Sequence, residues 1–405
     1  MTVSWTRSAL VLGVVSFAAL PGTSSTALAQ EMSHGTTMAD ARPADPPPLP
    51  LDRNELVEIR TFAEERTVEF VIGPLELEAG MEHLRLPIQM AEFPVDGWMH
   101  GFEVEMVDGA GEPIPPELLH HVNFIDPDKR ELFSPIARRV MAAGRETSTQ
   151  RLPGVIGYPM ADGDRMLISA MFANPLERDF PDANLVVRFF YSTESDGLIQ
   201  PRDIFPFYLD VMGPLGAKDF PLPPGRTVKA WEGRPAVDGR ILGIGGHVHD
   251  YATRIALIDV TAGKTLWEVE PEGTPGGHIT GVPNDMFLWS LGKKIRADHV
   301  YRIEVEYDNP LDEPAPDGGM GAIGGAVWVG KDVRWPEFDR TDEMYVEDLA
   351  NTLTAPDRLH GHGHGGMDAT ADMDATADMD RMPDHEEGAA TGEEDMPTHN
   401  GAHGH

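Results

Sequence analysis

The sequence of 405 residues contains no cysteine. This absence excludes disulfide bonds, thiolate catalysis and metal sites built from cysteine alone. Basic residues are also scarce, because 32 Lys and Arg stand against 67 Asp and Glu, for a formal net charge of −35. So negative a chain is a poor partner for nucleic acid or an anionic membrane surface, and its natural counterparts are cations. Buried cores must therefore hold the fold together, and a contribution from bound metal stays open.

No apolar run reaches the roughly 20 residues that a membrane-spanning helix needs. An apolar run near the start, residues 9–20, follows Arg7 and precedes the small residues Ala27 and Ala29. A charged start, a short apolar stretch and a small-x-small ending are typical of a secretory signal peptide. We therefore expect residues 1–29 to be removed after Ala29, and the mature protein to be soluble in the periplasm or secreted.

The body of the chain lacks long helical periodicity. Between residues 55 and 335, short runs rich in β-branched and aromatic residues alternate with clusters of Gly, Pro, Asn and Asp. This pattern predicts an all-β fold of antiparallel sandwiches with many short strands. The expected strands include residues 67–72, 165–172, 185–191 and 301–307.

Shifts in composition divide the chain further. They predict, in order, a disordered Pro-rich linker over residues 30–54, an N-terminal domain over 55–215, a C-terminal domain over 216–340, a short helix over 341–355 and a disordered tail over 356–405. Hydrophobic residues at four-residue spacing predict the helix. Thr341 stands just before them and is of a residue type that often caps helices, so it is the expected cap.

The tail is rich in possible metal ligands. It holds seven of the sixteen His and five Met, and 12 acidic residues stand against two Arg. Such a segment cannot bury enough apolar surface to fold. Two interpretations stay open, namely an acidic solvating tail and a segment that binds copper loosely.

Two histidines stand one residue apart in the sequence Gly246-His247-Val248-His249, between apolar runs that indicate strands. Side chains alternate along a strand, so both imidazoles face the same way with Cα atoms roughly 6.5–7 Å apart. Two neutral imidazoles at that separation can chelate one transition-metal ion. The alternative is a pair that faces solvent or bonds to a loop.

A second pair, His120-His121, lies in another apolar run. The preceding residues, 101–106 followed by the turn sequence 108–111, carry a hairpin signal. Adjacent residues on a regular strand face opposite sides, so these two histidines can bind one ion only if the strand twists or bulges there.

The order of these motifs resembles the copper type II, ascorbate-dependent monooxygenases, a family that includes peptidylglycine α-hydroxylating monooxygenase and dopamine β-monooxygenase. The resemblance covers most of residues 55–335. It rests on Gly101-Phe102-Glu103, His120-His121, Pro223-Pro224-Gly225, the pair His247 and His249, and a late Gly-rich segment with a Met.

The resemblance implies two jelly-roll domains in tandem, each with one copper ion, facing each other across a water-filled cleft. His247, His249 and Met320 would then hold the copper that binds dioxygen and hydroxylates a C–H bond. His120, His121 and a third residue would hold the electron-donating copper. The neighbouring glycines leave the register of Met320 open, and Met320 could also be core filler.

One departure from the family concerns the third ligand. Where the family has His, this chain has Met171, in the sequence Ala170-Met171-Phe172. Two imidazoles and a thioether form a softer set that favours Cu(I) and could impair electron delivery. Met171 could instead pack in the sandwich core. The family's disulfides are missing too.

The sequence therefore supports two hypotheses. The first is an exported copper monooxygenase that acts on a small-molecule or peptide substrate with dioxygen and an external reductant. The second is a copper-sequestering or copper-delivery protein on the same fold, without turnover. Of the other histidines, His278 is the one to watch as an additional ligand or substrate contact. A Gly-x-Ser-x-Gly elbow and a phosphate-binding loop are both absent.

Overall fold

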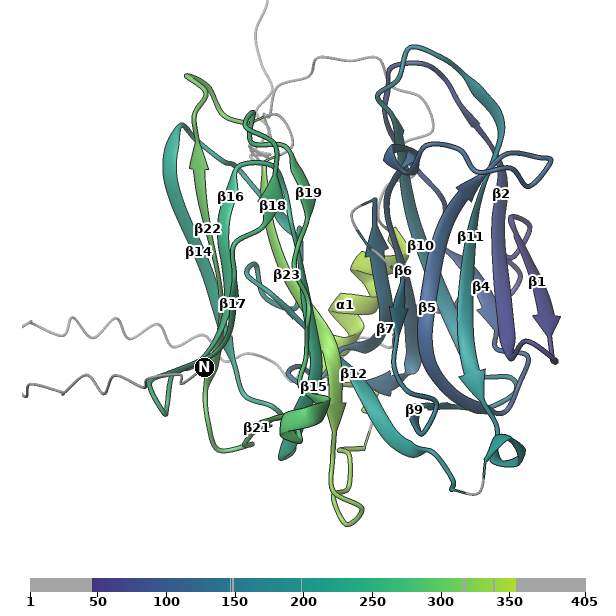
Figure 1. The fold of residues 1–405 in the computed structure, drawn as a ribbon, viewed down its shortest axis with the longest axis vertical. Helices are drawn as coiled ribbons and strands as arrows, with labels where there is room; N and C mark the ends of the chain where they lie inside the picture. The colour runs from purple at the N-terminus through teal and green to yellow at the C-terminus, as the bar shows by residue number, and fades with distance from the viewer. Residues whose placement is uncertain are drawn as a thin grey trace, which may run out of the picture. The chain divides into compact units, whose positions relative to one another are not determined.

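The structure is a computed structural model that describes residues 46–354, except 146, 148, 198, 316, 317 and 338. The predicted signal peptide, most of the linker and the tail lie outside the described residues. Within them, the all-β prediction is confirmed: antiparallel strands build two sandwiches of the jelly-roll type (Figure 1). No helix among the described residues is long and apolar enough to cross a membrane.

The N-terminal sandwich consists of two layers of strands. Its first layer comprises β1 (Val57–Phe62), β2 (Thr67–Leu77), β11 (Phe180–Ser192), β5 (Gly97–Val107) and β9 (Ile156–Met160), with β8 (Gln150–Arg151) paired to β5. Its second layer comprises β3 (Met81–Arg85), β10 (Arg165–Asn174), β6 (Leu119–Arg130) and β7 (Ala137–Gly144), with β4 (Gln89–Glu92) paired to β10. The core between the layers includes the fully buried Phe70, Phe124 and Phe172.

The C-terminal sandwich is built in the same way. One layer comprises β12 (Arg202–Asp210), β23 (Gly319–Trp328), β15 (Gly239–Val248) and β20 (Asp285–Met286), with β13 (Asp219–Phe220) and β21 (Lys293–Ile295) at its edges. The other comprises β14 (Gly225–Gly233), β22 (Tyr301–Asn309), β16 (Ala252–Asp259) and β17 (Lys264–Val269); β18 (Glu272–Gly273) and β19 (Ile279–Gly281) form a separate ribbon. Its core includes Ile255, Ile303 and Tyr307.

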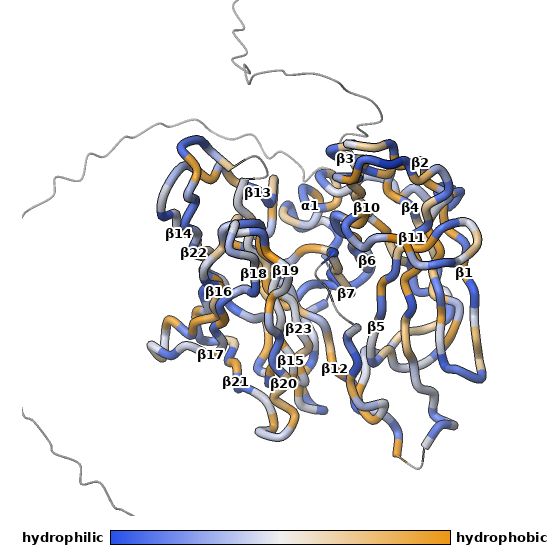
Figure 2. The backbone as a smooth tube through the Cα atoms, turned by 45° about the horizontal axis from the view of Figure 1, so that its top comes forward, coloured by the Kyte–Doolittle hydropathy of each residue, from blue (hydrophilic) through white to orange (hydrophobic). Residues whose placement is uncertain are grey.

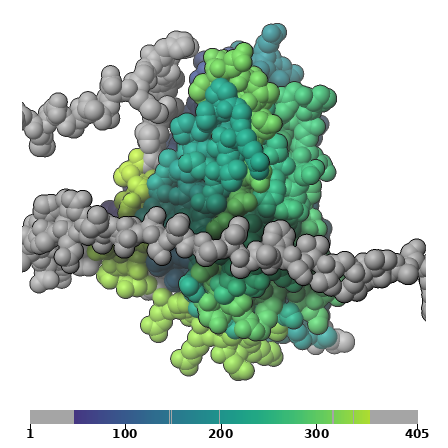
Figure 3. Space-filling model, turned by 90° about the vertical axis from the view of Figure 1, so that its left-hand side faces the viewer, coloured from purple at the N-terminus to yellow at the C-terminus, as the bar shows by residue number. Residues whose placement is uncertain are grey.

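Alternation between core and solvent sides is visible in the hydropathy of the strands, where orange apolar and blue polar positions are interspersed (Figure 2). On β14 the burial alternates residue by residue. The polar side of the β14-β22-β16-β17 sheet carries ion pairs, such as Arg254 with Glu304 and Arg302 with Glu232. Figure 3 brings the teal and green residues of this sandwich to the front. Ion pairs that are exposed or only partly buried contribute little stability, so the core must supply most of it.

The two sandwiches share strand pairing. β9 and β12 pair in parallel through Arg202 with Ile156 and Asp203 with Gly157, so that one sheet path runs through both. Each sandwich nevertheless has its own hydrophobic core. The boundary at about residue 215 stays a prediction, and β12 on its N-terminal side already pairs with β23 of the second sandwich.

The turn after β5 is present, since the Gly111 N–H donates to the Asp108 carbonyl oxygen. The hairpin that this turn sequence indicates is short: Pro113 pairs antiparallel with Val107, and the Ile114 N–H donates to the Met106 carbonyl oxygen. β6, which carries the second histidine pair, belongs to the other layer. One local expectation needs correction. The helix, α1 (Glu343–Thr354), is capped by Asp342 rather than Thr341: the Asp342 carboxylate accepts the Met344 N–H at 2.9 Å. The described residues also contain three short 3-10 helices, Pro116–Leu118, Glu194–Asp196 and Leu288–Ser290.

Candidate metal centre

His247 and His249 stand at the end of β15, as the sequence predicts. The strand pairs with β23, where His247 lies opposite Ala322 and Val248 opposite Gly321. The imidazole rings of the two histidines have centroids 5.5 Å apart and are nearly perpendicular. Both residues are half-buried, and the Nε2 atom of each is fully buried. The strand therefore presents two imidazoles close together, as a chelating pair requires.

Met320 occupies the neighbouring position on β23. It precedes Gly321, the partner of Val248, so the antiparallel register continues from it toward His249. Residues opposite each other in an antiparallel pair share a face, and so do residues two apart on one strand. The register thus puts Met320 on the face of His247 and His249. Met320 is half-buried and is not part of the hydrophobic core.

The hydroxyl group of Tyr307 links these two ligand candidates. Its oxygen accepts the backbone N–H of His249 and the backbone N–H of Met320, each at 3.0 Å, and its proton goes to the carbonyl oxygen of Met320. Burial raises the pKa of Tyr307 to about 12, so the hydroxyl keeps its proton at neutral pH. Sequence reasoning missed this residue, which looked like one more buried aromatic on a strand.

Replacing Tyr307 by Phe should therefore lower the free energy of unfolding by about 1–3 kcal/mol, because two buried N–H groups lose their acceptor. It should also weaken copper binding by the His247 and His249 pair. Chemical denaturation and copper titration measure the two effects. Tyr301→Phe is the matched control: Tyr301 is equally buried, but its hydroxyl accepts the Arg296 N–H instead of the His249 and Met320 N–H groups. Equal effects of the two variants on copper binding would contradict the positioning role.

His120 and His121 point their rings at each other because β6 has a bulge. Along β10, Phe172 pairs with Leu119 and the next residue, Met171, pairs with His121, so His120 is an extra residue without a cross-strand partner. An extra residue lets adjacent side chains turn to one side. The Nδ1 atoms of the two rings are 2.9 Å apart. β6 thus has the bulge that His120 and His121 need to bind one ion together.

Met171 is the cross-strand partner of His121. Its neighbours Ala170 and Phe172 are buried in the N-terminal core, whereas Met171 is half-buried and lies on the opposite face of β10. Ala170 and Phe172 thus pack in the core, whereas the half-buried position of Met171 does not fit the core-packing alternative. A thioether at this position is next to the histidine pair.

The two histidine pairs also meet each other. The rings of His120 and His249 are 6.0 Å apart, so the pairs are in contact here rather than facing each other from a distance, as the resemblance implies. A fifth ring, that of His83 on β3, is 5.1 Å from His120. Sequence reasoning did not connect His83 with the site, because only the pairing of β3 with β10 brings it there.

Burial keeps the imidazoles of His120 and His121 neutral. It lowers the pKa of His120 to about 3, with a further contribution from His249, and it lowers the pKa of His121 well below the usual value, with a contribution from His120. A neutral imidazole is the form that binds a transition metal. At neutral pH neither ring has to lose a net proton, but the proton shared between the two Nδ1 atoms has to move to the Nε2 atom of its ring before both Nδ1 atoms can bind one ion.

The same pKa shift predicts acid sensitivity of the metal-free protein. The folded state holds His120 at a pKa of about 3, against 6.5 for an ordinary histidine. The unfolded chain therefore binds more protons between these values, and the free energy of unfolding should fall as the pH drops from 6.5 toward 3, by up to about 1.4 kcal/mol per pH unit for one histidine.

Denaturation curves are measured across this pH range for the wild type and for the double variant His120→Asn with His121→Asn. The difference between the two proteins separates the contribution of the histidines to acid sensitivity from that of the carboxylates. The variant should lose less stability than the wild type on acidification. Parallel curves for the two proteins would show that the histidines are not held neutral.

The donor set fits copper in two respects. The His120 and His121 Nδ1 atoms form a hydrogen bond of 2.9 Å, and two nitrogens bound to one ion near a right angle, at the roughly 2.0–2.1 Å typical of zinc, would stand the same distance apart. Imidazoles and thioethers are also ligands that copper prefers. Among the described residues, no three or more His, Asp or Glu side chains are arranged so that they could hold a metal ion. Sets of two imidazoles and one thioether do not require such a group.

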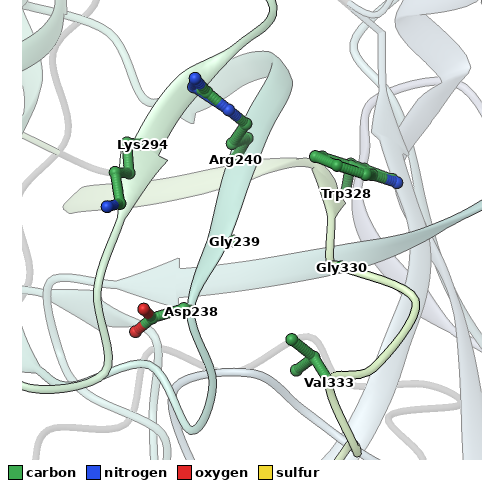
Figure 4. Close-up of a pocket in the computed structure, with 7 residues that line it drawn as sticks. All are labelled: Asp238, Gly239, Arg240, Lys294, Trp328, Gly330 and Val333. Carbon is green, nitrogen blue, oxygen red and sulfur yellow. The ribbon is translucent and has the colours of Figure 1, made fainter.

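Other candidate features lie elsewhere. His278 bonds to the carboxylate of Asp250 at 3.1 Å and His299 to that of Asp259 at 2.8 Å, so carboxylates hold both rings. A shallow pocket of about 260 Å³, lined by residues such as Arg240, Lys294 and Trp328, contains none of the predicted ligands (Figure 4). It lies at the start of β15, and the histidines lie at its end.

Comparisons with known proteins do not identify a family. No family model and no curated protein matches the chain. Among solved structures, the major capsid protein P2 of bacteriophage PM2 shares 10% identity over 64% of this chain and 100% of its own, with a TM-score of 0.30. PNGF-II shares 9% identity over 65% of each chain, with a TM-score of 0.31. A structure of infectious bursal disease virus, Gx strain, shares 9% identity over 73% of this chain and 78% of its own, with a TM-score of 0.21. At these scores the likenesses support no conclusion about function.

Proposed function

We propose that this protein is an exported copper protein that binds two copper ions with its two histidine pairs and hydroxylates an organic substrate, using dioxygen and an external reductant. The observation that carries the proposal is the bulge in β6, which turns the adjacent His120 and His121 toward each other. An extra residue that disrupts strand pairing and brings two neutral imidazoles together is typical of a functional site rather than of a structural strand.

The residues of the proposed site divide into two sets. His247, His249 and Met320 would hold the copper near which substrate is oxidised, and His120, His121 and a third donor would hold the copper that passes on electrons. Bound copper would supply one-electron redox chemistry and the activation of dioxygen. The protein orients the imidazoles by strand register, holds those of His120 and His121 neutral by burial, and fixes the His249 and Met320 backbones through Tyr307.

A second function, copper sequestration or delivery, is favoured by one observation. Met171 lies beside His121, and a thioether stabilises Cu(I). A site that retained Cu(I) too firmly would not donate electrons readily. In this hypothesis the His- and Met-rich tail would raise the local copper concentration at the folded body.

Oxygen consumption separates the two functions. The copper-loaded protein is given a reductant and a panel of amide and phenethylamine substrates, and product formation is followed alongside oxygen uptake. A monooxygenase should form hydroxylated product in proportion to the oxygen consumed, and the variant His247→Ala with His249→Ala should form none. Tight retention of Cu(I) without product would reject turnover and leave sequestration or delivery.

A further inference from the structure

We propose that the protein docks on a lipid surface with zwitterionic head groups, through the end of its shared sheet at which β9, β12 and β15 begin. This inference goes beyond the proposed function, because none of the residues that carry it is a candidate copper ligand. It assigns a role to large apolar side chains that the fold leaves exposed.

The most exposed of these side chains is that of Trp289, which is 100% exposed. It stands on the 3-10 helix between β20 and β21, at the edge of the sheet. Leu291 follows it and is 72% exposed, and Met286 precedes it and is 41% exposed. Clusters of exposed apolar side chains are typical of interaction sites. We call residues 286–291 the apolar tip.

Backbone hydrogen bonds hold the apolar tip in place. The Phe287 N–H donates to the Leu242 carbonyl oxygen at 2.7 Å, and the Phe287 carbonyl oxygen accepts the N–H groups of Ser290 and Gly292. The Phe287 side chain packs against the C-terminal core. Leu291 is left-handed, with φ at 60°, which is unfavourable for a bulky residue. The chain thus maintains a strained turn that exposes large apolar side chains, and strain of this kind is typical of functional sites.

Two further exposed apolar residues lie at the same end of the sheet. Val155 immediately precedes β9, and Ile199, which is 73% exposed, lies three residues before β12. β9 and β12 run in parallel, and β15 is parallel to β12 because both pair antiparallel with β23. The starts of these three strands therefore share one end of the sheet. β21 pairs with the first residues of β15, so the apolar tip belongs to this end too; β9 and β21 lie at the lower end in Figure 1.

The arrangement of these side chains fits a lipid surface better than a protein partner. A standard protein interface buries about 800 Å² on each partner, whereas a Trp side chain offers on the order of 150–250 Å². The apolar tip is also separated from Val155 and Ile199 by β23 and β15, so these are distinct projections rather than one patch. A fluid lipid interface accepts several projections at once, and Trp is enriched at such interfaces.

The charges beside the apolar tip suit lipid phosphates. Lys293 and Lys294 follow it directly and Asp285 precedes it, so cations are in excess there. Lys294 lines the shallow pocket together with Arg240 (Figure 4). The chain as a whole has a formal net charge of −35, which opposes docking on a strongly anionic surface. Zwitterionic head groups offer phosphates to these cations without a net negative surface charge.

Docking at this end leaves the histidine pairs open to solvent. β15 begins at the docking end and ends at Val248, so His247 and His249 lie at the far end of a strand of 10 residues. A strand of that length spans roughly 30 Å. A docked protein would therefore keep its candidate copper ligands well away from the lipid.

The experiment measures binding to phosphatidylcholine vesicles. The mature chain, residues 30–405, is used because the apolar run of residues 9–20 would itself bind lipid. Flotation gives the fraction bound as a function of lipid concentration, and tryptophan fluorescence reports the transfer of an exposed indole into the interface.

The test variant is Trp289→Ala with Leu291→Asn, since Asn tolerates the left-handed conformation. The matched control is Ile59→Ala with Val228→Ala, which removes two exposed apolar side chains from within β1 and β14. We expect the wild type to bind the vesicles with a blue shift of its fluorescence. The test variant should bind about 10-fold or more weakly, because two large apolar side chains no longer enter the interface. The control should bind like the wild type.

Failure of the wild type to bind the vesicles, or equal binding by the test and control variants, would overturn the inference. If the vesicles were not bound and analytical ultracentrifugation showed a dimer that Trp289→Ala abolished, the occupant would be a second copy of the chain instead. Copper content should be the same in all three proteins, so neither result bears on the copper sites.

Lipids with brominated acyl chains supply a second measurement that needs no variant. Trp289 is fully exposed, whereas the other Trp side chains of the described residues are half-buried or buried. Bromine quenches the fluorescence of an indole that enters the lipid. Strong quenching in the bound wild type is expected, and bound protein without quenching would contradict docking through the apolar tip.

Discussion

Replacing both His247 and His249 by alanine should remove one of two tightly bound copper ions and leave the chain folded. The two rings are half-buried at the end of β15 and belong to neither hydrophobic core. In domains of this size the cores, not the metal, supply most of the stability. The backbone N–H of His249 keeps its bond to Tyr307 in the variant, because that bond does not involve the side chain.

Elemental analysis after removal of loosely bound metal gives the copper content, and thermal melting reports the fold. The matched control is the double variant His278→Ala with His299→Ala, which removes two imidazoles from the same sandwich, bonded to the carboxylates of Asp250 and Asp259. The control should keep both ions. Equal copper content in the two double variants would remove His247 and His249 from the site.

Replacing Met171 by His should lower the reduction potential of the neighbouring copper site and raise its affinity for Cu(II), because it adds an imidazole beside His121. A tenfold gain in Cu(II) over Cu(I) affinity corresponds to a fall of about 59 mV. The face of β10 that carries Met171 is turned away from the N-terminal core, so the imidazole need not enter that core. The copper at His247 and His249 should change less.

Redox titration and thermal melting test this variant together, with Met171→Leu as the control for shape. If Met171 instead packed as a core residue, a buried imidazole would cost on the order of 1–3 kcal/mol as an imperfectly satisfied polar group. A destabilised Met171→His protein with unaltered copper potentials would therefore show that the side chain at position 171 does not bind the copper.

Local patterns in the sequence predicted much of the fold. β-branched and aromatic runs bounded by turn residues correctly predicted β2, β10, β11 and β22. The separation of His247 from His249 predicted a pair on one face, because strand periodicity is a local property. The need for a bulge at His120 also followed from that periodicity. The presence of the bulge depends on pairing with β10, which local patterns do not show.

The features that sequence reasoning missed all depend on long-range pairing. His83 reaches His120 only because β3 lies next to β10, about ninety positions later in the chain. Tyr307 binds the His249 and Met320 backbones because three strands meet at its hydroxyl. The turn sequence after β5 predicted the local return of the chain onto that strand, but it does not specify that β6 joins the other layer.

The central claim is that the two histidine pairs are the tight copper sites. The most direct test is a competition titration of the full-length chain with Cu(I) against a chelator of known affinity. It compares the wild type with a variant in which His120, His121, His247 and His249 are all alanine. The wild type should take two equivalents from the chelator, and the variant should take neither. A variant that still took two equivalents would place the tight copper outside these residues and contradict the account.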